Sequence, residues 1–201
     1  CRSLGFFAEG KLKRLDVEGG SVVTLCEARE GLGGSWNEDG SILFAPSSQS
    51  PIFRVSASGG TPVALTHLDA LKQETSHRWP YFLPDGRHFL FSTRTISTGV
   101  RADVDAIFVS SLDGKERKFV IQATTNAAYA DGYLICGLGA KLMAVAFDPA
   151  KLTTEGDPVS LVERIQINGP DGAATFSVSS TNLLAYQSRS SQTGSQLMIF
   201  D

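Results

Sequence analysis

A short motif returns along the chain at a nearly constant spacing. Residues 34–45 read GSWNEDGSILFA, and the same order of aromatic residue, Asp-Gly pair and apolar run recurs in RWPYFLPDGRHFLFS (residues 78–92) and AYADGYLIC (residues 128–136). The three Asp-Gly pairs lie 46 residues apart. A fourth copy, FSVSSTNLLAY (residues 176–186), has Asn182 in the turn position. The pattern predicts one structural unit repeated about every 46 to 50 residues.

Each unit has the sequence pattern of short antiparallel strands. In the clearest copy the strands are expected at residues 33–37, 41–45, 51–57 and 61–66. Tight turns at Asp39-Gly40 and Gly59-Gly60 would join them, because glycine tolerates the positive φ of hairpin turns. Helical periodicity is nearly absent, and only residues 68–74 could form a short helical turn, with a loop as the equal alternative.

Four short strands in a repeat of this length are typical of a β-propeller blade, which buries its faces by stacking on its neighbours around an axis. The sequence therefore predicts an all-β fold in which residues 1–201 form a single propeller segment. We expect three full four-stranded antiparallel blades at residues 33–66, 77–123 and 127–164, and partial blades at residues 3–28 and 173–201. An open arc from a propeller of roughly six to eight blades is the favoured arrangement. A small ring closed by joining the two partial blades is the alternative.

The charge and composition exclude several classes of partner. The 18 Lys and Arg residues are scattered and are balanced by 21 Asp and Glu residues, so no positive surface for nucleic acid is expected. No apolar run is long enough to cross a bilayer. We expect this chain to be a segment of a longer parent polypeptide, which would reach a membrane only through an anchor elsewhere in that parent. The hydrophobic fraction of 42% is enough for a core, in which Cys26 and Cys136 are expected as inert buried thiols.

Sequence motifs for catalysis and cofactor binding are incomplete. Residues 31–36 begin like a dinucleotide fingerprint but place Trp36 where its third glycine belongs, and residues 55–59 lack the first glycine of a nucleophile elbow. Asp103 and Asp105 lack the other ligands of a calcium loop and read as a solvated loop. The histidines are too few and too dispersed to indicate zinc: His67, His77 and His88. We therefore expect no catalytic residue, no metal and no cofactor.

One local group of side chains suits ligand binding. His77, Arg78 and Trp79 combine a titratable ring, a planar set of donors and a large aromatic face at the start of a blade, near one mouth of the expected channel. Arg78 could pair with a ligand carboxylate and Trp79 could stack on the ligand. The alternative is structural: Trp79 packs between blades, Arg78 pairs with an acid of the neighbouring blade, and His77 caps a turn.

The place of two further features in the repeat predicts their roles. Trp36 and Phe82 precede equivalent Asp-Gly turns and are expected in the core. Residues 93–105, with Arg94 and Arg101, interrupt a regular blade and are expected either to bind a partner or to be mobile.

The chain also resembles a known family over nearly its whole length. Residues 33–46, 52–63, 74–91, 142–149, 176–179 and 184–186 are similar to TolB-type, WD-repeat-like β-propellers, most of all to those attached to bacterial receptor serine/threonine kinases of the acidobacterial kind. The resemblance implies an extracytoplasmic sensing or protein-binding part, joined through one membrane segment to a cytoplasmic kinase. The glycine-rich loop with its lysine, the His-Arg-Asp motif and the Asp-Phe-Gly motif of kinases do not occur in this sequence.

The function expected from these observations is recognition without catalysis. The segment would be a periplasmic or otherwise extracytoplasmic sensor that binds a protein or a peptide, with a small molecule as a further option. Two alternatives stay open. One is a propeller-fold hydrolase or the gating propeller of a peptidase, which would need carboxylates or metal ligands converging from several blades. The other is a structural spacer, with no convergent polar cluster at either mouth.

Overall fold

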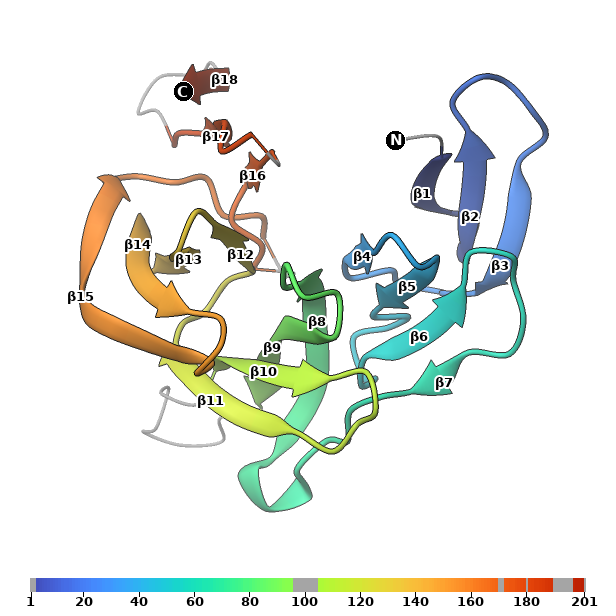
Figure 1. The fold of residues 1–201 in the computed structure, drawn as a ribbon, viewed down its shortest axis with the longest axis horizontal. Coiled ribbons are helices and arrows are strands. Elements are labelled where there is room, and N and C mark those ends of the chain that lie inside the picture. Colours follow the sequence, from blue (N-terminus) through green and yellow to red (C-terminus); the bar gives the residue numbers. More distant parts are fainter. Residues whose placement is uncertain (1–2, 96–104, 170–171, 180, 190–196, 201) are drawn as a thin grey trace.

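Five antiparallel sheets follow one another along the chain and are arranged radially around a common axis (Figure 1). The structure is a computed structural model and describes residues 3–95, 105–169, 172–179, 181–189 and 197–200. Three four-stranded sheets lie between two three-stranded ones, which confirms the predicted propeller arrangement of full and partial blades. We number the sheets as blades 1 to 5 in chain order.

Within every blade the strands pair in chain order. Blade 1 contains β1 (Ser3–Ala8), β2 (Lys11–Asp16) and β3 (Val23–Glu27). Blade 2 contains β4 (Gly34–Trp36), β5 (Ser41–Phe44), β6 (Phe53–Ser56) and β7 (Val63–Ala64). Blade 3 contains β8 (Glu74–Phe82), β9 (His88–Thr95), β10 (Ala106–Ser111) and β11 (Arg117–Gln122). Blade 4 contains β12 (Ala127–Ala130), β13 (Tyr133–Leu138), β14 (Lys141–Asp148) and β15 (Thr153–Val162). Blade 5 contains β16 (Phe176–Val178), β17 (Leu184–Gln187) and β18 (Leu197–Phe200).

The first strands of the full blades lie nearest the axis. β8 contacts both β4 and β12, and β12 in turn contacts β16 (Figure 1). Two ends of the blades can then be distinguished. At the linker end the chain passes from one blade to the next, in residues 28–33, 65–73, 123–126 and 163–169 with 172–175. At the turn end the first two strands of a blade are joined, in residues 37–40, 83–87, 131–132 and 181–183.

The predicted turns have the backbone conformation that the sequence requires. Gly40, Gly86 and Gly132 have φ values of 84°, 64° and 83°, and Asn182 has 66°. Asp39 Oδ1 accepts a hydrogen bond from the Ser41 amide at 2.8 Å, so the aspartate of the Asp-Gly pair caps its own turn. The repeated dipeptide thus sets the hairpin that joins the first and second strands of each full blade.

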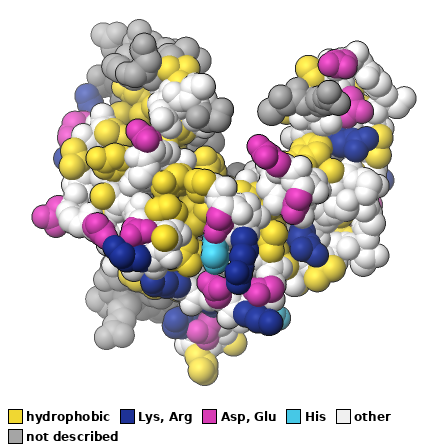
Figure 2. All heavy atoms as spheres, in the orientation of Figure 1, with side chains coloured by type: hydrophobic (Ala, Val, Ile, Leu, Met, Phe, Trp, Pro, Cys, Tyr) yellow, Lys and Arg dark blue, Asp and Glu magenta, His cyan; other side chains and the backbone are white. Residues whose placement is uncertain are grey.

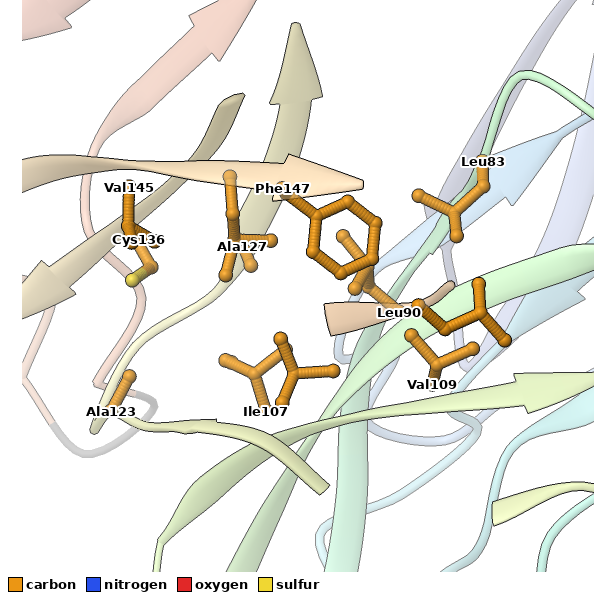
Figure 3. Close-up of a cluster of buried hydrophobic side chains, with 12 residues drawn as sticks. Leu83, Leu90, Ile107, Val109, Ala123, Ala127, Cys136, Val145 and Phe147 are labelled. Carbon is orange, nitrogen blue, oxygen red and sulfur yellow. The ribbon is translucent and has the colours of Figure 1, made fainter. Parts of the chain in front are cut away.

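Both faces of the second strand of each full blade are buried, because blades cover one another. In β9, Phe89 and Phe91 pack in the cluster shared with blade 2, whereas Leu90 between them packs in the cluster shared with blade 4. This alternation follows from the two-residue side-chain period of a strand. Figure 3 shows Leu90 and Phe147 of adjacent blades in one such cluster, and the blades are held together by apolar contacts of this kind.

Helical and cysteine features are minor. Ala70–Lys72 form one turn of 3-10 helix, whose first amides bond to the Asp69 side chain, so the helical alternative for residues 68–74 holds in part. In the described part of the chain no helix is both long and apolar enough to cross a membrane.

Cys136 is buried, and burial raises the pKa of its thiol to about 12. Cys26 is only half-buried, and burial raises the pKa of its thiol as well.

Candidate functional site

His77 lies inside the protein, not at a channel mouth. Its side chain is fully buried in β8 and its ring centroid is 4.7 Å from that of Phe91. The Thr66 hydroxyl accepts a hydrogen bond from the Ile52 amide at 2.9 Å, so its own proton can be donated to His77 Nδ1 at 2.7 Å. His77 Nε2 then donates to Glu74 at 3.1 Å. When the ring is neutral, the form that burial favours, these two contacts place its proton on Nε2.

Glu74 holds this region together as a buried carboxylate. Besides His77 it bonds to the Arg117 guanidinium on the outermost strand β11 and accepts from the Asp69 amide at 2.7 Å. Burial raises the pKa of Glu74, but the bonds from His77, Arg117 and the Asp69 amide outweigh it and lower the pKa to about 2. Burial lowers the pKa of His77, against the effect of Glu74. The network joins the linker before blade 3 to the innermost and outermost strands of that blade. With Glu74 held in this way, β8 begins at residue 74, earlier than the expected residue 77.

Trp79 has a strained backbone. Its φ is +50°, a region that aromatic residues rarely occupy, and it lies in a bulge where the register of β8 against β9 shifts between Arg78 and Tyr81. The Trp79 amide donates to Leu32 O at 2.9 Å. A Cβ at Gly33 would lie 2.8 Å from Trp79 Cδ1, so the linker before blade 2 can pass here only because residue 33 has no side chain. The Trp79 side chain stays partly exposed.

Arg94 stacks on Trp79. The Cζ atom of Arg94 lies 5.2 Å from the centre of the Trp79 ring, a distance at which a guanidinium and an aromatic face attract each other. Arg94 also pairs with Asp105, whose second oxygen accepts from the Thr95 amide at 3.1 Å. The prediction of a solvated loop is therefore wrong for Asp105, whose side chain is 20% exposed, because Asp105 compensates Arg94 at the end of β9. Asp103 and Arg101 lie outside the described residues.

Arg78 is positioned next to this pair and is nearly buried. Its Nε donates to Ser76 Oγ at 2.8 Å. The hydrogen bonds from Ser48, with a smaller contribution from the charge of Arg78, lower the pKa of Glu30 in the linker before blade 2. The charge of Arg78 therefore acts on an acid near the neighbouring blade, and the pairing of Arg78 with such an acid stays a prediction.

Segments from several blades converge on Arg94 and Trp79. Gly33 comes from the linker before blade 2, and Gly172 from the linker before blade 5. A Cβ at Gly172 would overlap the Arg94 guanidinium and would lie 3.7 Å from Thr124 O of the linker before blade 4. Of the three predicted site residues, Arg78 and Trp79 are thus at the linker end where linkers meet, and His77 is beneath it. We call Arg78, Trp79, Arg94 and Asp105 the linker-end cluster.

Trp36 and Phe82 are not fully in the core. Both pack against buried clusters, but both remain partly exposed and line an open groove at the turn end. The prediction of core positions is wrong to that extent, because the first strand of a blade covers its neighbour with one side only. Among the described residues, no three His, Cys, Asp or Glu side chains are close enough together to hold a metal ion.

Comparison with known proteins gives the fold and no family. No protein-family model matches the sequence, and no curated protein matches it. TolB from Acinetobacter baumannii superposes with a TM-score of 0.63 at 19% identity, over 95% of this chain and 46% of TolB. A gluconolactonase from Xanthomonas campestris gives 0.68 at 16% identity, over 95% of this chain and 65% of the enzyme. A chain of the nidogen/laminin complex gives 0.64 at 16% identity, over 89% of this chain and 67% of its own length.

This chain therefore spans about half of TolB and about two thirds of the gluconolactonase. At these identities the likeness establishes a β-propeller fold, in agreement with the TolB-type resemblance of the sequence, and does not transfer a function.

Proposed function

We propose that the chain is a non-catalytic propeller module that recognises a protein or a peptide through the linker-end cluster. The observation that carries this proposal is the conformation of Trp79, which is held at φ +50° with its ring partly exposed and Arg94 stacked on it. Strained backbone of this kind persists where the surrounding structure holds it in place, and such residues gather at binding sites.

The chemistry of the cluster suits a peptide. Trp and Arg are the residues that most often contribute large shares of binding energy in protein interfaces. The Asp105 carboxylate and the Trp79 ring restrict the motion of the Arg94 side chain before any ligand arrives, which lowers the entropy lost on binding. Segments from several blades meet there, so an extended ligand could contact more than one of them.

A second candidate function is a propeller-fold hydrolase, because a gluconolactonase is among the structures that this chain resembles. In that case Asp105 is the carboxylate at the linker end to test. Hydrolysis of glucono-lactone that is lost in Asp105→Asn would support the enzyme, whereas absence of turnover with a folded protein would leave the recognition proposal.

The cellular context is part of the proposal. We place the module outside the cytoplasm as the sensor of a membrane-anchored parent, and its attachment to a receptor serine/threonine kinase stays a prediction from the sequence resemblance. Reading the complete open reading frame for a membrane span and a kinase domain tests both statements.

The binding proposal is tested with peptides selected from a random display library. A selected peptide should bind Trp79→Leu roughly 30-fold more weakly than the wild type, the effect of losing a central aromatic contact. Tyr133→Leu is the matched control, because Tyr133 is an exposed aromatic residue at the start of β13, 49% accessible. Equal binding by wild type and Trp79→Leu, with both folded, would overturn the proposal.

A further inference from the structure

The turn end has an open groove that the linker-end cluster does not explain. Its volume is about 810 Å³ and it lies between the first turns of blades 2 and 3, with Ser3 of blade 1 at its margin. The size is within the range of sites that hold a side chain or a small ligand. Its lining is mixed, with aromatic and proline side chains beside three carboxylates: Trp36, Phe82, Pro84, Glu38, Asp39 and Asp85.

The groove is preformed by contacts between the two blades. Asn37 Nδ2 in the turn of blade 2 donates to Gly86 O in the turn of blade 3 at 3.1 Å. Ser35 Oγ accepts from the Phe82 amide at 3.0 Å, which joins β4 to β8 below the groove. The Trp36 ring rests against Gly5 of β1, where an added Cβ would be 3.6 Å away. Trp36 and Phe82 are therefore fixed in place before any ligand binds.

Two of the three carboxylates of the groove have no ion-pair partner among the described residues. Glu38 and Asp39 are exposed, and neither forms an ion pair with any side chain that the structure describes. Asp85 also lines the groove, and its carboxylate pairs with His88. Figure 2 shows acidic side chains, in magenta, on the side of the central hollow where β4 lies. The field at this margin is negative, and a low-dielectric wall beside it strengthens attraction of a cation.

An aromatic floor with an acidic rim fits one kind of ligand group. A guanidinium or ammonium group is attracted both to the negative face of an aromatic ring and to carboxylates, while its aliphatic stem packs on apolar surface. An anion would be repelled by Glu38 and Asp39. We propose that this groove binds an arginine or lysine side chain of a basic peptide segment, as a second site distinct from the linker-end cluster.

The experiment uses the two tryptophans of the chain as separate reporters. Trp79→Phe leaves Trp36 as the single tryptophan, in the groove itself. Into this variant we would titrate a blocked Gly-Arg-Gly-Arg-Gly peptide, the same peptide with glutamate in place of arginine, and free arginine, following Trp36 fluorescence and, in parallel, heat of binding. The arginine peptide should saturate and the glutamate peptide should not. Free arginine should bind more weakly than the peptide, because it lacks the flanking backbone.

Removing the two unpaired carboxylates tests whether the arginine peptide binds in the groove. Glu38→Gln with Asp39→Asn should weaken binding of the arginine peptide about 5- to 10-fold, the effect of two charge contacts at a partly exposed site. Asparagine keeps the oxygen that caps the turn, so the fold is retained. The control pair Asp148→Asn with Glu155→Gln removes the same charge from the outer turn of blade 4, where both residues pair with Lys151.

Each outcome decides the matter. Weaker binding in the groove pair alone supports the site. An equal loss in both pairs would mean attraction by net charge only, and heat of binding without saturation, or no heat at all, would overturn the proposal. None of these outcomes bears on the linker-end cluster, since the reporter variant already lacks Trp79.

Discussion

The two tryptophans lie at opposite ends of adjacent blades, in opposite electrostatic settings. At the linker end, Arg94 beside Trp79 is paired with Asp105, and Arg117 is paired with Glu74 at the start of β8. At the turn end Glu38 and Asp39 beside Trp36 have no ion pair among the described residues. One repeated unit therefore produces two different surfaces, because both linker-end pairs form within blade 3, whereas the Asn-Glu-Asp-Gly turn of blade 2 contains no basic residue.

The largest expected effect is on stability at the linker end. Glu74→Ala leaves the buried His77 Nε2 proton without its acceptor and the Arg117 guanidinium, 29% exposed, without its ion-pair partner, so the free energy of unfolding should fall by about 3 kcal/mol. Glu38→Ala removes an exposed carboxylate and should change it by less than about 0.5 kcal/mol. Urea unfolding of the two variants measures the difference. Equal losses would show that the two ends are not distinguished by charge pairing.

Lowering the pH should remove the stabilisation that Glu74 provides. The pKa of Glu74 is lowered to about 2, so its ionised form stabilises the protein above pH 4.5 and this stabilisation disappears as the pH falls toward 2. The stability difference between wild type and Glu74→Gln should shrink by roughly 2 to 3 kcal/mol over this range. Urea unfolding of both proteins at several pH values measures this stability difference. A difference that stays constant between pH 4.5 and pH 2 would contradict the role of Glu74.

A smaller effect concerns the backbone of Trp79. Alanine is normally more stable than glycine in a strand by about 0.5 to 1 kcal/mol. At φ +50° the order should reverse, so Trp79→Gly should be more stable than Trp79→Ala by about 1 kcal/mol. The same two substitutions at Trp36, whose φ is not positive, should show the normal order. A normal order at both positions would mean that Trp79 is not strained.

The sequence predicted the blades well because their signals are local. Asp-Gly pairs fix turns, and continuous apolar runs on strands such as Phe89 to Phe91 indicate that both faces are covered. The site was harder to predict. Thr66, Glu74 and Arg117 form one network without any repeated copy, and the conformation of Trp79 depends on Gly33 far away in the chain. The repeat also suggested equivalent roles for Trp36 and Phe82 but could not show that their outer sides stay open.

The role of the linker end is tested most directly by the two indole N–H signals of a ¹H–¹⁵N correlation spectrum, one from each tryptophan. A library-selected peptide should shift the Trp79 signal, together with the backbone amides of Gly33 and Gly172, and leave the Trp36 signal in place. Shifts confined to Trp36 or to the outer strands β7, β11 and β15, with the Trp79 signal unchanged at saturation, would contradict recognition through the linker-end cluster.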